Sequence, residues 1–79
     1  MTQTRAIALY SKPDCVQCVA TKRRMDRLGL KYTEVDVSED ADALAFIKGL
    51  GYMQAPVVVL DDDTHWSGNR PDLIKQIGA

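Results

Sequence analysis

Two cysteines, Cys15 and Cys18, are the residues of this 79-residue chain whose type and spacing point most directly to chemistry. They lie three positions apart at the start of a segment with helical periodicity, so their Cα atoms are expected about 5–6 Å apart on one helical turn. That separation permits a disulfide without movement of the backbone. A C-x-x-C pair that follows a strand and opens a helix is typical of thiol–disulfide exchange.

The position of the two cysteines on that helix distinguishes their sulfurs. Cys15 lies at the expected N-terminus, where unsatisfied N–H groups and the positive end of the helix dipole favour its thiolate. Cys18 lies one turn further on the core-facing side, so we expect it to be less exposed and less acidic. Cys15 is therefore predicted to attack and Cys18 to resolve the mixed disulfide. Lys12 adds a favourable charge, which Asp14 partly opposes.

Other uses of the two cysteines fit less well. A zinc site usually needs four ligands, and besides Cys15 and Cys18 the chain offers only His65 as a plausible soft ligand, so we predict no metal. A structural disulfide closing so small a loop would remove little entropy from the unfolded chain. A metal or iron–sulfur module shared between two chains and a redox-regulated binding protein without turnover remain open alternatives.

The elements that position the cysteines follow from the periodicity of the chain. Strands are expected at residues 5–10, 31–37, 57–60 and 65–66, and helices at residues 15–28, at residues 40–50 and from Pro71 onward. Ser38 is the expected cap of the second helix, and Asn69 or Ser67 that of the last. A helical crossover makes the first two strands parallel, and the turn at 61–64 makes the last two antiparallel. The prediction is an α/β fold, β-α-β-α-β-β-α, with a four-stranded mixed sheet flanked by three helices.

Composition bounds the function classes. Ten Lys and Arg against eleven Asp and Glu give a formal net charge of −1, which supplies no basic surface for nucleic acid or an anionic membrane. Two cysteines are too few for a disulfide-stapled secreted miniprotein, and the apolar runs are far shorter than the roughly 20 residues of a membrane helix. The N-terminus carries no secretory apolar region. We expect one cytoplasmic domain over residues 1–79.

Three motifs extend the cysteine pair toward a known family. They are Lys12-Pro13-x-Cys15-Val16-Gln17-Cys18, Leu50-Gly51-Tyr52-x-Gln54-Ala55-Pro56-Val57-Val58-Val59 and Trp66-Ser67-Gly68-x-Arg70-Pro71-Asp72. Over nearly the whole chain they resemble the NrdH-redoxins of the thioredoxin/glutaredoxin superfamily, in particular the actinobacterial or phage type. The resemblance implies a thioredoxin-like fold and a monomeric dithiol–disulfide oxidoreductase. It also implies reduction by NADPH-thioredoxin reductase and electron transfer to the large subunit of class Ib ribonucleotide reductase. No cofactor would be bound, since flavin and nicotinamide belong to the reductase.

The resemblance also implies roles for individual residues. It makes Cys15 the attacking and Cys18 the resolving thiol, and it matches Pro56 to a cis-proline that faces them. A cis bond would let residue 55 offer its backbone N–H and C=O to an extended target segment. From the residues alone, a trans proline that starts the following strand is equally plausible. The residues expected to contact substrate or partner are Lys12, Val16, Gln17, Ala55, Pro56, Trp66, Ser67, Gly68, Asn69, Arg70 and Asp72.

Two positions depart from the family pattern. Residue 69 is Asn where an aromatic residue is usual, which would remove an apolar contact for the partner, and Asp14 stands where a small residue is commoner. Trp66 has an alternative role in core packing. A glutathione-dependent glutaredoxin is the alternative enzyme, in which Lys12 would hold a carboxylate of the tripeptide.

The route of the Cys18 proton and the remaining charged residues complete the expectations. No carboxylate lies within residues 6–10, so water, or Lys12 acting through water, is expected to take the proton. His65 is expected to face solvent and not to act as a general base. A basic set on the first helix is interpreted as a solvated face, with a docking patch for acidic partners as the alternative: Lys22, Arg23, Arg24 and Arg27.

Overall fold

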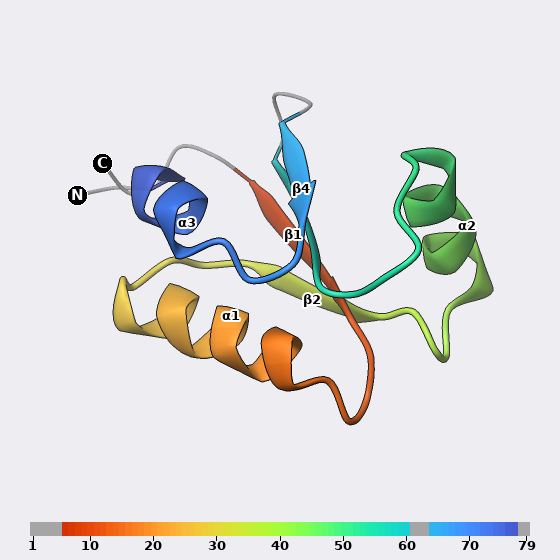
Figure 1. Ribbon diagram of the computed structural model, residues 1–79, viewed down its shortest axis with the longest axis horizontal. Helices are drawn as coiled ribbons and strands as arrows, with labels where there is room; N and C mark the ends of the chain where they lie inside the picture. The colour runs from red at the N-terminus through yellow and green to blue at the C-terminus, as the bar shows by residue number, and fades with distance from the viewer. Residues whose placement is uncertain (1–5, 61–63, 78–79) are drawn as a thin grey trace.

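The computed structural model describes residues 6–60 and 64–77. They form three layers, a sheet with helices on both of its faces (Figure 1). The elements in chain order are β1 (Ile7–Ser11), α1 (Val16–Arg27), β2 (Thr33–Asp36), α2 (Ala41–Gly49), β3 (Val57–Leu60), β4 (His65–Ser67) and α3 (Pro71–Ile77). The predicted order β-α-β-α-β-β-α is confirmed.

The sheet is mixed, as predicted. Its strand order is β2-β1-β3-β4, with β1 parallel to β2 and antiparallel to β3, and with β3 antiparallel to β4. Leu9 in the middle of β1 faces Glu34 of β2 on one side and Val58 of β3 on the other. This arrangement is the thioredoxin-like fold, and it brings the ends of β1 and β2 and the start of β3 close to the first turn of α1.

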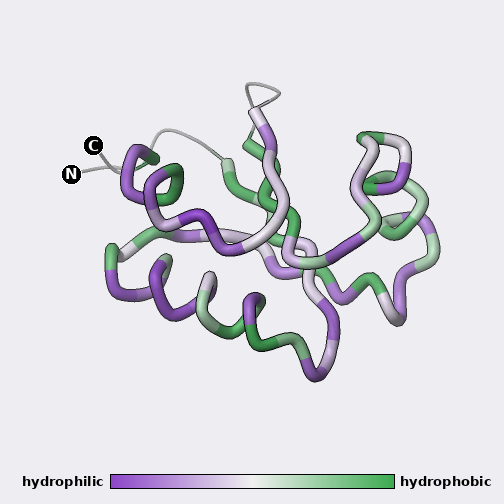
Figure 2. Tube along the Cα trace, in the orientation of Figure 1, coloured by the Kyte–Doolittle hydropathy of each residue, from purple (hydrophilic) through white to green (hydrophobic). Residues whose placement is uncertain are grey.

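Alternate residues of the central strands build two apolar layers. Val58 belongs to a cluster with residues of α1 and α3, whereas its neighbour Val57 belongs to a cluster with Ile47 of α2. In Figure 1, α1 and α3 accordingly lie together on one side of the sheet and α2 lies on the other. Figure 2 shows β1 and β3 among the most hydrophobic parts of the trace, whereas α1 mixes apolar and polar residues along its length.

The helix α1 starts and stops as the sequence predicts, with one exception on its buried face. Cys18, Thr21 and Met25 are buried, and Gly29 (φ 71°) ends the helix in the left-handed conformation that glycine adopts readily. Leu28 follows at the same helical spacing but is 44% exposed, and it is the C-cap residue at which the helix ends.

The expected cap of α2 was wrong. Asp40, not Ser38, caps the helix, and its carboxylate accepts the backbone N–H of Ala43 at 3.0 Å. The Ser38 hydroxyl instead donates to Asp36 Oδ1 at 2.6 Å, which uses it in the turn after β2. On α2, Phe46 remains 45% exposed and packs on Tyr10 with ring centroids 5.6 Å apart.

The expected cap of α3 was also wrong. Pro71 opens the helix as predicted, but neither Ser67 nor Asn69 caps it. The Arg70 carbonyl accepts the backbone N–H of Ile74 at 3.0 Å, so Arg70 immediately precedes the first helical turn. Ser67 and Asn69 lie too early in the chain to reach that turn, and both side chains hydrogen-bond elsewhere.

Among the described helices, none is long and apolar enough to cross a membrane.

Candidate active site

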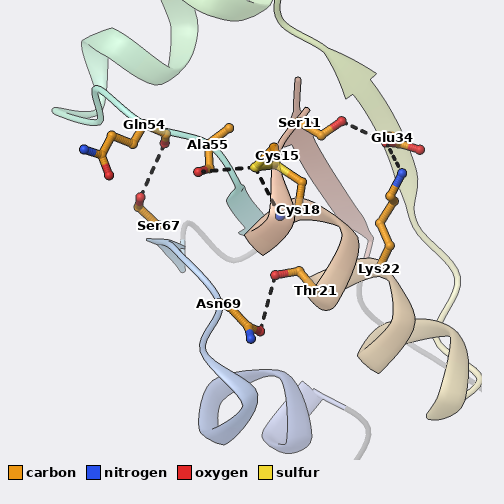
Figure 3. The surroundings of a disulfide bond; sticks show 10 residues. All are labelled: Ser11, Cys15, Cys18, Thr21, Lys22, Glu34, Gln54, Ala55, Ser67 and Asn69. Atoms are coloured by element: carbon orange, nitrogen blue, oxygen red, sulfur yellow. Dashed lines mark hydrogen bonds and ion pairs between the residues drawn. A yellow bond between two sulfur atoms is a disulfide. The ribbon is translucent and has the colours of Figure 1, made fainter. Parts of the chain in front are cut away.

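Cys15 and Cys18 are joined by a disulfide at the first turn of α1 (Figure 3). Their Cα atoms lie 5.2 Å apart, within the range that the C-x-x-C spacing predicts. Cys18 is 2% exposed, whereas Cys15 is partly exposed at the N-cap position. The backbone N–H of Cys18 donates to Cys15 Sγ at 3.1 Å. The predicted difference in exposure is therefore present, and the accessible sulfur is the one that accepts a helix N–H.

The loop before β3 lies against the accessible sulfur. The Ala55–Pro56 peptide bond is cis, and Cys15 Sγ lies 3.9 Å from the carbonyl oxygen of Ala55. Pro56 is buried, and its carbonyl oxygen accepts the N–H of Gly68 at 2.8 Å. Ala55 remains partly exposed beside the sulfur, and its contact with a target segment stays a prediction.

The end of β4 and the residues that follow it are hydrogen-bonded to this loop and to α1. The Ser67 hydroxyl donates to the carbonyl oxygen of Gln54 at 3.4 Å, and the buried Thr21 hydroxyl donates to Asn69 Oδ1 at 3.4 Å. In the view of Figure 3 the Gln54–Ser67 pair lies to the left of the disulfide and the Thr21–Asn69 pair lies below it. Asn69 thus fixes the segment to the helix that carries both cysteines.

Gly68, in the same segment, lies near Gln17 in the first turn of α1. Its φ of 87° is in the left-handed region, and a Cβ built on it would lie 3.5 Å from Gln17 Oε1. Position 68 therefore needs glycine for its backbone conformation and not for lack of space.

Three of the predicted partner contacts are buried or paired within the chain. Trp66 is 6% exposed within the core cluster, which fits its alternative role in core packing, and its role as a partner contact stays a prediction. Arg70 and Asp72 are exposed but pair with each other, through Nε–Oδ1 at 3.2 Å and Nη2–Oδ2 at 3.0 Å. The hydrogen bond from Arg70 lowers the pKa of Asp72 and raises that of Arg70.

His65 differs from its expected position as well. It is half-buried, and its Nδ1 hydrogen-bonds the hydroxyl of Tyr52 at 2.6 Å, with the two rings edge to face. Its partner lies in the loop between α2 and β3, so His65 holds that loop to β4 instead of facing solvent.

The remaining predicted contacts surround the sulfurs on exposed surface. Val16 is 83% exposed at the start of α1, and Gln17 and Lys12 are exposed beside it. Lys12 and Val16 line the same open hollow of about 560 Å³ as both cysteines. Among the described residues, no group of three His, Cys, Asp or Glu side chains could hold a metal ion.

Comparison with known proteins assigns the fold and the site to a family. The glutaredoxin family model matches residues 7–66. The chain is 40% identical over 72 residues to the glutaredoxin-like protein NrdH of Salmonella typhimurium, covering 91% of this chain and 88% of that protein. It is 39% identical over 71 residues to NrdH of Escherichia coli strain K12, covering 90% and 86%.

The chain belongs to the glutaredoxin family, in its NrdH branch. A solved structure of the E. coli glutaredoxin-like protein NrdH-redoxin matches with a TM-score of 0.85 at 39% identity, covering 90% of this chain and 92% of that one. As an NrdH-type glutaredoxin, the protein is a thiol–disulfide oxidoreductase with a C-x-x-C motif. The actinobacterial or phage type stays a prediction.

Sequence reasoning missed one polar cluster of this NrdH-type site. Buried Ser11 at the end of β1 donates to Glu34 Oε2 at 2.8 Å, and Lys22 Nζ binds the same oxygen at 3.0 Å. These bonds lower the pKa of Glu34, with Ser11 as the larger cause and Lys22 next. Lys22 also lines the open hollow that contains both cysteines, and its side chain is 33% exposed. The sequence signal that could have placed Lys22 near the sulfurs is its i, i+4 spacing from Cys18, which puts both side chains on one face of the helix.

Proposed function

We propose that this NrdH-type protein is a cytoplasmic, monomeric electron donor, a single domain of residues 1–79 that reduces protein disulfides. Its proposed target is the large subunit of class Ib ribonucleotide reductase, and its proposed reductant is NADPH-thioredoxin reductase. The observation that carries the proposal is the difference in exposure between partly exposed Cys15 and Cys18 at 2%. A target disulfide can reach the first sulfur, whereas only Cys15 itself can reach the second.

The proposed exchange proceeds in two steps. The Cys15 thiolate attacks one sulfur of the target disulfide, so a mixed disulfide forms and the second target sulfur leaves as a thiolate that takes up a proton. Cys18, having lost its proton to water in the hollow lined by Lys12 and Lys22, then attacks Cys15 Sγ. The target leaves with both cysteines reduced, and the protein keeps the Cys15–Cys18 disulfide. Two electrons move to the target, and the flavoprotein reductase returns them from NADPH, so the redoxin needs no bound cofactor of its own.

Two observations support thioredoxin-like over glutathione-linked chemistry. The E. coli relative is described as a glutaredoxin-like protein with a thioredoxin-like activity profile. The segment from Ser67 to Asn69 is also bonded to Gln54 and Thr21, which leaves less room for a tripeptide beside the sulfurs. The alternative, a glutathione-dependent glutaredoxin, is favoured by the family model and by the exposed Lys12.

A comparison of two reductants separates these functions. Insulin disulfide reduction is measured with NADPH plus thioredoxin reductase, and separately with NADPH, glutathione and glutathione reductase. We expect turnover in the first system, and efficient turnover only in the second would refute the proposal. The comparison is repeated with N69F, in which an aromatic side chain replaces the amide at the partner surface. Ribonucleotide reduction by a class Ib enzyme with this protein as the only dithiol donor tests the proposed target.

A further inference from the structure

A pocket of about 240 Å³ opens on the α2 side of the active site. Val37, Leu44 and Ile47 give it apolar walls, and Ala55 closes the end nearest the sulfurs. Small-molecule sites usually occupy about 300–1,000 Å³, and an apolar cavity of about 150 Å³ accommodates benzene. The volume therefore suits one large apolar side chain better than a whole metabolite.

Two lysines give this pocket a positive charge. Lys12, after β1, and Lys48, in the last turn of α2, both line it, and no Asp or Glu within residues 6–60 and 64–77 does. Both lysines are exposed, and neither forms an ion pair within residues 6–60 and 64–77. A carboxylate beside the apolar side chain of a ligand would complement them.

Ala55 lies between the pocket and the reacting sulfur. This residue lines the pocket, and its carbonyl oxygen lies 3.9 Å from Cys15 Sγ. An extended segment advances about 3.3 Å per residue, so a chain attached to Cys15 reaches the pocket within a few residues of its own cysteine. Met53, 81% exposed, stands at the rim as a flexible apolar contact of the kind that adapts to different sequences.

We propose that this pocket is a docking subsite for the target polypeptide, which binds an apolar side chain flanked by a carboxylate close to the target cysteine. The proposal rests on the proposed function and adds a sequence preference to it. Lys12 and Lys48 would attract the carboxylate, while Leu44 and Ile47 would cover the apolar side chain.

The test uses the protein alone, reduced with dithiothreitol and desalted, so that no reductase contributes. Synthetic peptides with an intramolecular disulfide carry an Asp-Leu pair, before the first cysteine in one peptide and after the second in another. Matched peptides carry Asn-Leu or Asp-Ala at the same places. The second-order rate constant for peptide reduction is measured by acid quench and chromatography, with hydroxyethyl disulfide as the substrate that has no side chains to dock.

One of the two Asp-Leu peptides is expected to react fastest with the wild-type protein. Replacing its Leu by Ala should slow reduction about 15- to 60-fold, for the loss of about two to three buried methylene groups. K48A should slow its reduction about 1.5- to 5-fold, the range for one exposed ion pair, and should leave the Asn-Leu peptide unchanged. K75A, which removes an exposed lysine of α3, is the matched control and should change nothing.

Two results would overturn the subsite. Equal rates for the three peptides in both registers would show that the pocket contacts no target side chain. Glutathione disulfide reduced as fast as the Asp-Leu peptide, with the same dependence on Lys48, would show that the lysines bind a tripeptide instead. Failure of the proposed function looks different. A protein without exchange chemistry would not reduce hydroxyethyl disulfide either, and a glutathione-dependent protein would turn over only in the glutathione system of the two-reductant comparison.

Discussion

Replacing Gly68 by alanine tests whether backbone conformation or space makes glycine necessary beside the active site. At φ 87° an alanine is strained, which costs about 1–2 kcal/mol. The added Cβ would lie 3.5 Å from Gln17 Oε1, an ordinary contact, so no steric penalty is added. In a domain of this size 1 kcal/mol shifts Tm by roughly 4–8 °C, so G68A should melt about 4–16 °C below the wild type.

Gly49 provides the matched control for this experiment. It is the last residue of α2, its φ lies outside the left-handed region, and a Cβ on it would meet nothing within 4 Å. G49A should therefore raise the free energy of unfolding by about 0.4–1 kcal/mol. Thermal and urea denaturation of the oxidised proteins, followed by far-UV circular dichroism, measure both changes. A G68A protein as stable as the wild type, or a G49A protein destabilised as much as G68A, would refute the reasoning.

Further predictions concern the sulfurs, the missed polar cluster and the core. C18S should accumulate a mixed disulfide with insulin, visible by non-reducing mass spectrometry, whereas C15S should form none; normal insulin turnover by C18S would contradict the two-thiol mechanism. E34Q should lose about 0.5–1 kcal/mol of stability at pH 7, since the pair with Lys22 is partly exposed. Because the folded pKa of Glu34 is lowered, that difference should be present above its unfolded pKa of about 4.3 and vanish as pH falls through the folded value. I74A should cost about 2–5 kcal/mol in urea denaturation, because Ile74 is fully buried where α3 packs on the core; a loss below about 1 kcal/mol would mean that α3 adds little to the fold.

The order of elements could be predicted from the chain because its apolar periods are local. The helix expected at 15–28 is Val16–Arg27 with Cys15 and Leu28 as its caps, and the strand expected at 57–60 is present unchanged. The difference in exposure between the two cysteines also follows from their spacing on one helix, because one turn separates an N-cap from a core-facing position.

The errors arose where local alternatives compete or where distant residues meet. Ser38 and Asp40 are both good caps, and only the turn that Asp36 makes with Ser38 decides between them. The bond between Ser11 and Glu34 joins residues 23 positions apart, and it depends on the parallel register of β1 and β2. No local pattern carries that register, so the Ser11–Glu34 bond could not be foreseen, and the spacing of Cys18 and Lys22 points only to the lysine of this cluster. The pocket beside α2 depends in the same way on residues far apart in the sequence.

The burial of Trp66 supplies the protein with an optical reporter. It is the only tryptophan of the chain, it is 6% exposed, and it lies on β4 directly before Ser67, which is bonded to the loop beside Cys15. Its emission in the folded state should come from an apolar environment and shift to the red when the chain unfolds. Because no second indole contributes, the emission of an unlabelled sample reports folding at the strand that borders the redox site. A change in that emission when the protein is reduced would show that opening the disulfide alters the packing around Trp66.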